Sequence, residues 1–249
     1  MKLKYILFAV LLPIVGCSLF EKDEEKEEII LPETLTLVKD RIGNTYEVGY
    51  DQVSNTNQDP YVQKTDAAGN VSWRVAHAIS GLREQATLVN LDPEDNPWVV
   101  FSVNGSDSTD ASFQKRYSQT HAFDSVLFSD YGYGGGAEVS ILAKLNRENG
   151  QIEKATFLIA RTKEGSIFSP FETNSFRVNA FGVGYEKVVV EAQSWYRPPS
   201  AESTEDNFVF HPAAVNEHAI GSYWEMSLVM PLNLSELQEI ELTKADLVE

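Results

Sequence analysis

The sequence predicts an all-β protein, and three observations support this class. Turn residues recur at intervals of about 8 to 12 along the chain from Leu35 onward, which is typical of sandwiches, barrels and propellers. Long helical periodicity is missing. Hydrophobic residues make up 43% and aromatic residues 11% of the 249 residues, enough to form an ordered core. The length suits a single all-β domain.

The first segment has the features of a secretory leader. Lys2 and Lys4 precede an apolar run of about eleven residues, 5–15, whereas a helix needs about 20 to cross a bilayer. Residues 14–17, Ile-Val-Gly-Cys, resemble the lipobox of bacterial lipoproteins. The resemblance implies that Cys17 is acylated and becomes the first mature residue, so that it anchors the protein to a membrane. The alternative is an ordinary signal peptide that is cut elsewhere and leaves an incidental thiol.

An acidic segment follows the cysteine. Residues 21–28, EKDEEKEE, contain six acids and two lysines, a composition that predicts an extended, solvated spacer. An acidic stretch in this position also resembles the export signal that sends some lipoproteins of the Bacteroidetes to the cell surface. We therefore expect a signal peptide over 1–16, a lipidated acidic tether over 17–33 and one all-β domain over 34–249.

The domain is expected to be built from successive hairpins. Turn residues such as Asp, Asn and Gly separate the apolar runs. The predicted strand pairs are 34–39 with 45–50, 61–65 with 71–77, 87–91 with 98–103, 139–145 with 152–160 and 176–181 with 187–195, followed by a strand over 223–230. The runs 98–103 and 188–190 are apolar at consecutive positions, which predicts burial on both faces.

Two pairs of segments repeat each other. Residues 37–46 align without a gap with 89–98, and residues 61–71 align with 141–152 with one insertion. The stretch 60–73, PYVQKTDAAGNVSW, resembles the β-propeller repeat family labelled SBBP. This resemblance implies four-stranded blades of about 40 to 45 residues, hence a small or degenerate β-propeller of four to five blades. The same short strands also allow a β-sandwich, and residues 106–136 and 198–207 look like insertions.

The carboxyl end leaves two alternatives open. Ser235 with Gln238 three residues on is a possible capping box that would start a short helix. A closing strand competes with it.

Charge and cysteine content exclude several classes of function. The formal net charge of −17 argues against binding to nucleic acid, whose affinity depends on Lys and Arg. A single cysteine excludes an intramolecular disulfide and a multi-thiolate metal site. The sequence matches neither serine-hydrolase nor zinc-helix motifs, and His77 is interpreted as a buried strand residue.

Acidic turns are the remaining option for a cofactor. Asp92, Glu94, Asp95 and Asn96, or Asp107 with Asp110, offer the oxygen ligands that calcium prefers, but neither group follows the twelve-residue calcium loop. Bonds from Asp and Asn to their own turn backbone are the favoured explanation of these residues. We therefore expect no cofactor, with calcium as the alternative.

Aromatic residues give the only candidate binding site. Trp195, Tyr196 and Arg197 precede two prolines and, with Tyr131 and Tyr133, form a candidate stacking surface for sugar rings or a partner protein. The alternative is that Trp195 ends a buried strand.

Three hypotheses for function follow. The first is an exported, membrane-anchored binding module of the bacterial envelope, in the outer membrane and either periplasmic or surface-exposed, with a protein or glycan partner. The second is a secreted hydrolase or lyase acting on glycans through carboxylates such as Asp107, Asp110 or Glu138. The third is a structural subunit of an envelope assembly.

Overall fold

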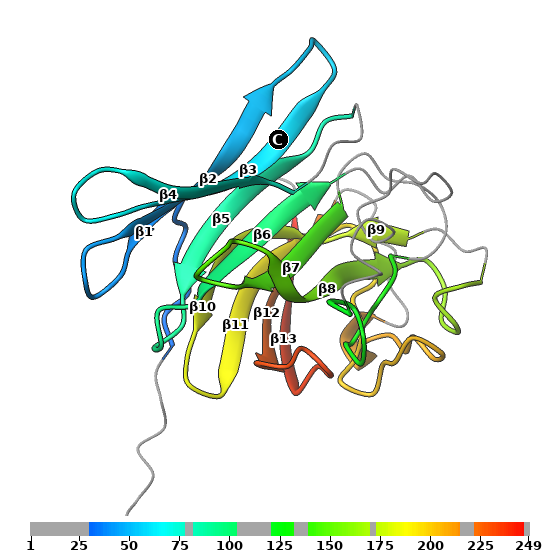
Figure 1. Cartoon of the computed structure of the whole chain (residues 1–249). Helices are drawn as coiled ribbons and strands as arrows, with labels where there is room; N and C mark the ends of the chain where they lie inside the picture. The colour runs from blue at the N-terminus through cyan, green and yellow to red at the C-terminus, as the bar shows by residue number, and fades with distance from the viewer. Residues whose placement is uncertain are drawn as a thin grey trace, which may run out of the picture.

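The computed structural model describes residues 30–77, 82–103, 121–131, 139–169, 173–214 and 222–246. The described chain is all-β and forms three antiparallel sheets (Figure 1). The helical part of these residues is one short 3-10 turn, Pro212–Ala214. Among the described residues, no helix has the length and the apolar composition needed to cross a bilayer.

Each sheet is a meander whose strands follow one another in chain order. The first sheet contains β1 (Leu37–Lys39), β2 (Thr45–Gln52), β3 (Gln58–Thr65) and β4 (Val71–Ala76). The second contains β5 (Gln85–Leu91), β6 (Pro97–Val103), β7 (Val139–Leu145), β8 (Ile152–Arg161) and β9 (Thr173–Ser175). The third contains β10 (Arg177–Val183), β11 (Lys187–Ser194), β12 (Ser222–Pro231) and β13 (Glu239–Asp246).

The predicted hairpins are confirmed. All five expected strand pairs form antiparallel ladders within a few residues of the expected bounds. At the carboxyl end the strand alternative is confirmed, because 239–246 pairs along β12 and no helix follows Ser235. Three sheets account for the strands of the described chain, and long connections take up much of the remaining length. The blade number of four to five stays a prediction.

The second sheet is the core of the molecule. Strands β6 and β7 are each buried at every position but one, Ser102 and Lys144, so the expectation of burial on both faces is confirmed for the apolar residues of Trp98 to Val103. The other apolar run differs. Val188 and Val190 are buried but Val189 is only half-buried, because β11 turns one face to solvent and alternates instead.

One turn geometry recurs at the hairpins. Asp40, Asp66 and Asp92 each accept hydrogen bonds from the backbone N–H two and four residues later, at 2.8 to 3.1 Å. An asparagine at the fourth position also donates its side-chain amide to each carboxylate. The third position is left-handed in every copy, at Gly43, Gly69 and Asp95. Three of the four turns in the two sequence repeats are therefore versions of one turn, and the longer turn at Asn146 differs.

These turns meet at one end of the molecule. Arg41 of the first turn pairs with Asp95 of the third at 2.8 Å. The Arg147 carbonyl in the β7–β8 turn accepts bonds from Lys64 at 3.0 Å and from the Trp73 indole at 3.1 Å. Gly150 in that turn has a φ of 72° and lies so close to the Trp73 ring that a Cβ would be only 2.7 Å away. The turns thus join the first sheet to the second.

The chain enters the domain at this same end. Glu33 and Phe181 exchange two backbone hydrogen bonds, and Thr34 Oγ1 donates to the Asn179 carbonyl at 2.8 Å. Ile30 and Leu31 cross over Gly182, where a Cβ would lie 2.6 Å from Ile30. We call this the tether end, and the opposite end, where the strands β2, β4, β6 and β11 end, the distal end (Figure 1).

A buried arginine organises a connection at the distal end. Arg161 is fully buried and its guanidinium donates to the carbonyl oxygens of Gly165, Ser166 and Ser169 at 2.7 to 3.1 Å. Burial lowers its pKa, yet the three carbonyls replace water as its partners. No sequence pattern indicated this role.

The repeated turn allows a matched stability test. Asp92 is buried and also lies 3.4 Å from the Trp98 indole nitrogen, whereas Asp66 makes the same turn bonds at a partly exposed site. We expect Asp92→Ala to lower the free energy of unfolding by about 3 kcal/mol, because it leaves buried donors unpaired. Asp66→Ala should lower it by much less. Urea unfolding measures both, and equal losses would contradict the importance of burial at Asp92.

Candidate functional site

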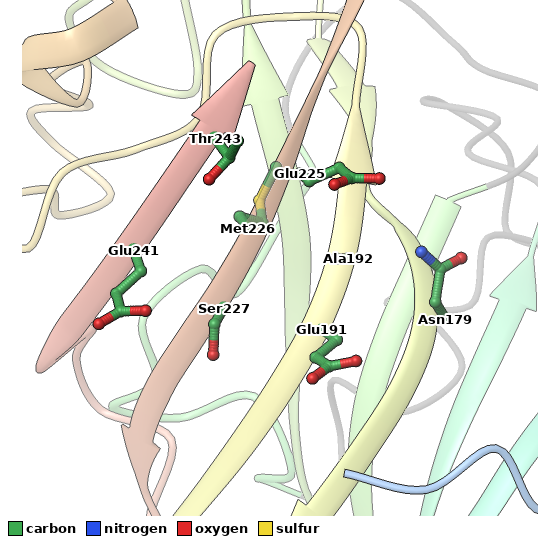
Figure 2. Close-up of a pocket in the computed structure, with 8 residues that line it drawn as sticks. All are labelled: Asn179, Glu191, Ala192, Glu225, Met226, Ser227, Glu241 and Thr243. Atoms are coloured by element: carbon green, nitrogen blue, oxygen red, sulfur yellow. The ribbon is translucent and has the colours of Figure 1, made fainter. Parts of the chain in front are cut away.

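The outward face of the third sheet carries a row of polar side chains. Strand register places Glu191, Ser227 and Glu241 opposite one another on β11, β12 and β13. Gln193, Glu225 and Thr243 form the next row toward the distal end. Because directly opposed residues of antiparallel strands share a face, both rows point to the same side. Figure 2 shows the glutamates, Ser227 and Thr243 projecting from three neighbouring strands.

A hollow of about 300 Å³ lies over these rows. Asn179 lies at its β10 side, where the register shifts between Val178 and Ala180 (Figure 2). A bulge of this kind bends the strand and re-aims a side chain. The lining residues are Asn179, Glu191, Ala192, Glu225, Met226, Ser227, Glu241 and Thr243. The hollow is therefore open, polar and acidic.

Two aromatic rings lie beside the hollow. Trp195 directly follows β11 and contacts Tyr223 of β12, with ring centroids 6.4 Å apart and planes tilted by 42°. Trp195 is 43% exposed. The Tyr223 hydroxyl donates to Glu225 at 3.2 Å, which ties the aromatic pair to the polar rows. We call Trp195, Tyr223 and the hollow together the outer-face site.

Electrostatics keep the Tyr223 phenol protonated. Partial desolvation and the bond to Glu225 raise its pKa above the ordinary value of 10.0. The phenol therefore remains a hydrogen-bond donor at neutral pH. Gln193 reaches the same Glu225 oxygen at 3.5 Å, so that one carboxylate is oriented by two neighbours.

The residues proposed from the sequence are not gathered into one surface. Trp195 is exposed as expected, but Tyr131 is buried at 5% exposure against the Phe157 ring and presents no surface for stacking. Tyr196 is half-buried and packs on the hydrophobic core. The Arg197 guanidinium lies 4.7 Å from the centre of the Phe210 ring, and its backbone pairs with Arg161. Tyr133 lies outside the described residues.

Tyr223 belongs to the candidate site and was not predicted from the sequence. The alternation of Tyr223, Glu225 and Ser227 with apolar residues along β12 is the signal that could have found it, since alternate residues share one face of a strand. Which face is outward is decided by how the third sheet packs on the second.

The acidic turns considered for calcium have other partners. The Asp92 carboxylate accepts the turn bonds described above, and Asp95 pairs with Arg41. Across the described ranges, no three His, Cys, Asp or Glu side chains are grouped so as to hold a metal ion. Asp107, Asp110, Glu138 and Cys17 lie outside those ranges.

The contacts of His77 and His121 indicate structural roles for these side chains. His77 is buried and its ring contacts Phe101 with centroids 5.1 Å apart. Burial lowers its pKa to about 3, so the imidazole is neutral in the folded protein at physiological pH. His121 Nδ1 lies 2.6 Å from an Asp124 carboxylate oxygen at an exposed position.

Comparisons with known proteins add one finding. No family model matches the sequence, and no curated protein is similar to it in sequence. Among solved structures, the endo-arabinase from Bacteroides thetaiotaomicron VPI-5482 superposes with a TM-score of 0.34 at 12% sequence identity, over 88% of this chain and 74% of that one. A likeness of this size carries no argument about function.

Two alanine substitutions distinguish the surface ring of the outer-face site from a ring of the core. We expect Tyr131→Ala to lower the free energy of unfolding by about 3 kcal/mol, because it leaves a cavity beside Phe157. Trp195→Ala should change it by less than about 1 kcal/mol, since its ring is largely at the surface. Urea unfolding of the two variants measures this difference. A large loss for Trp195→Ala would assign that ring to the core instead.

Proposed function

We propose that this protein is a lipid-anchored binding module of the bacterial envelope and that its outer-face site binds glycans. The observation that carries this proposal is the exposed Trp195–Tyr223 pair beside a hollow lined with hydrogen-bonding side chains. Sugar rings present apolar C–H faces and a rim of hydroxyl groups. An aromatic ring next to a row of acceptors and donors complements both.

The polar rows suit hydroxyl groups. Carboxylates of Glu191, Glu225 and Glu241 accept charge-assisted hydrogen bonds, and Ser227 and Thr243 both donate and accept. Because no Lys or Arg lines the hollow, an acidic polysaccharide would be repelled. The proposed ligand is therefore a neutral sugar chain or one with amino groups.

Binding is favoured over hydrolysis. Glu191, Glu225 and Glu241 are all exposed on an open sheet face. A general-acid carboxylate in a glycoside hydrolase is instead desolvated, which keeps it protonated. The carboxylates first considered for hydrolysis lie outside the described residues, so hydrolysis remains the second hypothesis and is included as an outcome of the test below. A protein partner on the same aromatic pair is the other outcome.

We further propose a small propeller-like arrangement of the sheets. Three consecutive meanders support it, since propeller blades are four-stranded meanders in chain order. The first strand of the second sheet also lies beside both other sheets: β5 contacts β1, β2 and β3 of the first sheet and β10 of the third, and the Asn90 side chain donates to the Phe181 carbonyl at 3.0 Å. A radial arrangement places equivalent strands around one axis. The β-sandwich is the alternative, because successive sheets stack face to face in both architectures.

The anchor and the location rest on the leader. Cys17 follows an apolar run and a small residue, and the acidic residues 21–28 separate it from the domain. Export and acylation place the protein at an envelope membrane, with the outer membrane as the proposed location on either its periplasmic or its external side.

Glycan binding is tested by titrating neutral, amino-containing and acidic oligosaccharides into the purified protein. We expect the first two classes to bind and Trp195→Ala to weaken that binding about tenfold, because the stacking ring is lost. Phe168→Ala, which removes a ring exposed by 58% elsewhere, is the matched control. An unchanged affinity of Trp195→Ala would contradict the assignment, and release of shorter sugars would favour hydrolysis.

The anchor is tested by fractionation of cells that express the full-length protein. We expect Cys17→Ala to move the protein from the membrane fraction to the soluble fraction, because no acyl chains can be attached. Ser18→Ala next to it is the control and should leave the distribution unchanged. Mass spectrometry of the mature protein should find acyl chains on Cys17, and an unmodified sulfur would overturn the proposal.

A further inference from the structure

The tether end carries the most exposed large apolar side chains of the described chain. Ile42, Leu31 and Tyr185 are exposed by 76%, 73% and 69%, whereas the other exposed large apolar side chains reach at most 58%. Ile42 lies in the β1–β2 turn, Leu31 on the entering chain and Tyr185 in the β10–β11 turn. Single exposed apolar residues are ordinary on protein surfaces, but three at one end form a pattern.

Contacts link the three segments that carry these side chains. Leu31 crosses over Gly182, three residues before Tyr185. Arg41, the neighbour of Ile42, is close enough to Tyr185 for the two groups to influence each other electrostatically. Arg41 also pairs with Asp95, and the neighbouring strand β5 is joined to β10 through Asn90 and Phe181. The turns and the entering chain are therefore neighbours (Figure 1).

We propose that the tether end docks on the surface of a phospholipid bilayer by inserting Ile42, Leu31 and Tyr185 into its interface. This inference rests on the proposed acylation of Cys17, which supplies the occupant. Ile30 lies thirteen positions after Cys17, and a spacer of this length has a mean reach of roughly 20 Å and a limit of roughly 45 Å. The bilayer is thus presented to this end at a high effective concentration.

Charge selects the kind of lipid surface. The full chain has a net charge of −17, and part of this negative charge lies in the acidic spacer next to the membrane. The Arg41 guanidinium next to Ile42 is already paired with the Asp95 carboxylate. Docking on anionic headgroups would be repulsive. The three apolar side chains instead fit a zwitterionic phospholipid surface, where burial of apolar area is the driving force.

Docking would orient the outer-face site. Strand β11 runs from Lys187, next to the tether-end turn, to Ser194, just before Trp195. Eight residues of strand span roughly 26 Å. The Trp195–Tyr223 pair would therefore be held away from the membrane, toward a ligand in solution or in the surrounding matrix.

The experiment places a fluorescent probe at each end of the mature lipidated protein in phosphatidylcholine vesicles. Glu186→Cys at the tether end and Glu202→Cys at the distal end are both exposed glutamates, and each carries the same environment-sensitive dye. We expect an apolar shift and protection from an aqueous quencher for the dye at position 186 and none for the dye at position 202. Ile42→Ser combined with Tyr185→Ser should abolish the shift while the protein stays with the vesicles. Val53→Ser combined with Phe168→Ser is the matched control.

A second measurement separates docking from anchoring. The full mature chain with Cys17→Ala is titrated with the same vesicles, and we expect weak binding that Ile42→Ser reduces about tenfold. If the wild-type protein is not acylated, the anchor proposal fails, and this titration alone decides docking. Equal signals from both probes would overturn the docking proposal, as would serine substitutions that have no effect. It would also be overturned if the protein formed a dimer that the serine substitutions dissociate, without any response of the dye to vesicles.

Discussion

The burial of the central sheet on both faces is the constraint on which the rest of this structure depends. The residues of β6 from Trp98 to Val103 and the neighbouring strand β7 have almost no exposed surface, so both faces of these strands must be covered. The first and third sheets provide that cover and in exchange bury one face of their own. Removing apolar area from water is the main driving force for this stacking. The other faces of the outer sheets are left to solvent and are free to carry function.

Hydrogen bonds and ion pairs of the polar turns align the strands within the stacked sheets. A buried sheet core fixes which face of a strand is inward but leaves the ends of the hairpins free to shift. The Asp-Asn turns hold three of the hairpins in one register, and contacts such as Arg41 with Asp95 and Trp73 with the Arg147 carbonyl join the first sheet to the second. These contacts between turns bring the first and second sheets together at the tether end.

This polarity gives a physical account of the proposed function. The entering chain, the hairpin turns and three exposed apolar side chains share one end of the molecule. The aromatic pair and the acidic hollow lie on the outward face of the third sheet, where the polar side of a half-buried strand projects to solvent. An anchored module needs this separation, because a ligand site that faced the membrane would be shielded from its ligand.

Local periodicity and turn chemistry were enough to predict the all-β class, the five hairpins, the double burial of Trp98 to Val103 and the repeated Asp turns. The same patterns predicted Tyr131 as a surface ring and gave no sign of the roles of Tyr223 and the buried Arg161. These three positions depend on packing, since exposure is set by which face of a strand or loop meets another sheet. Local residue patterns do not contain that information: Trp195 and Tyr131 look alike in sequence, and packing alone exposes one and buries the other.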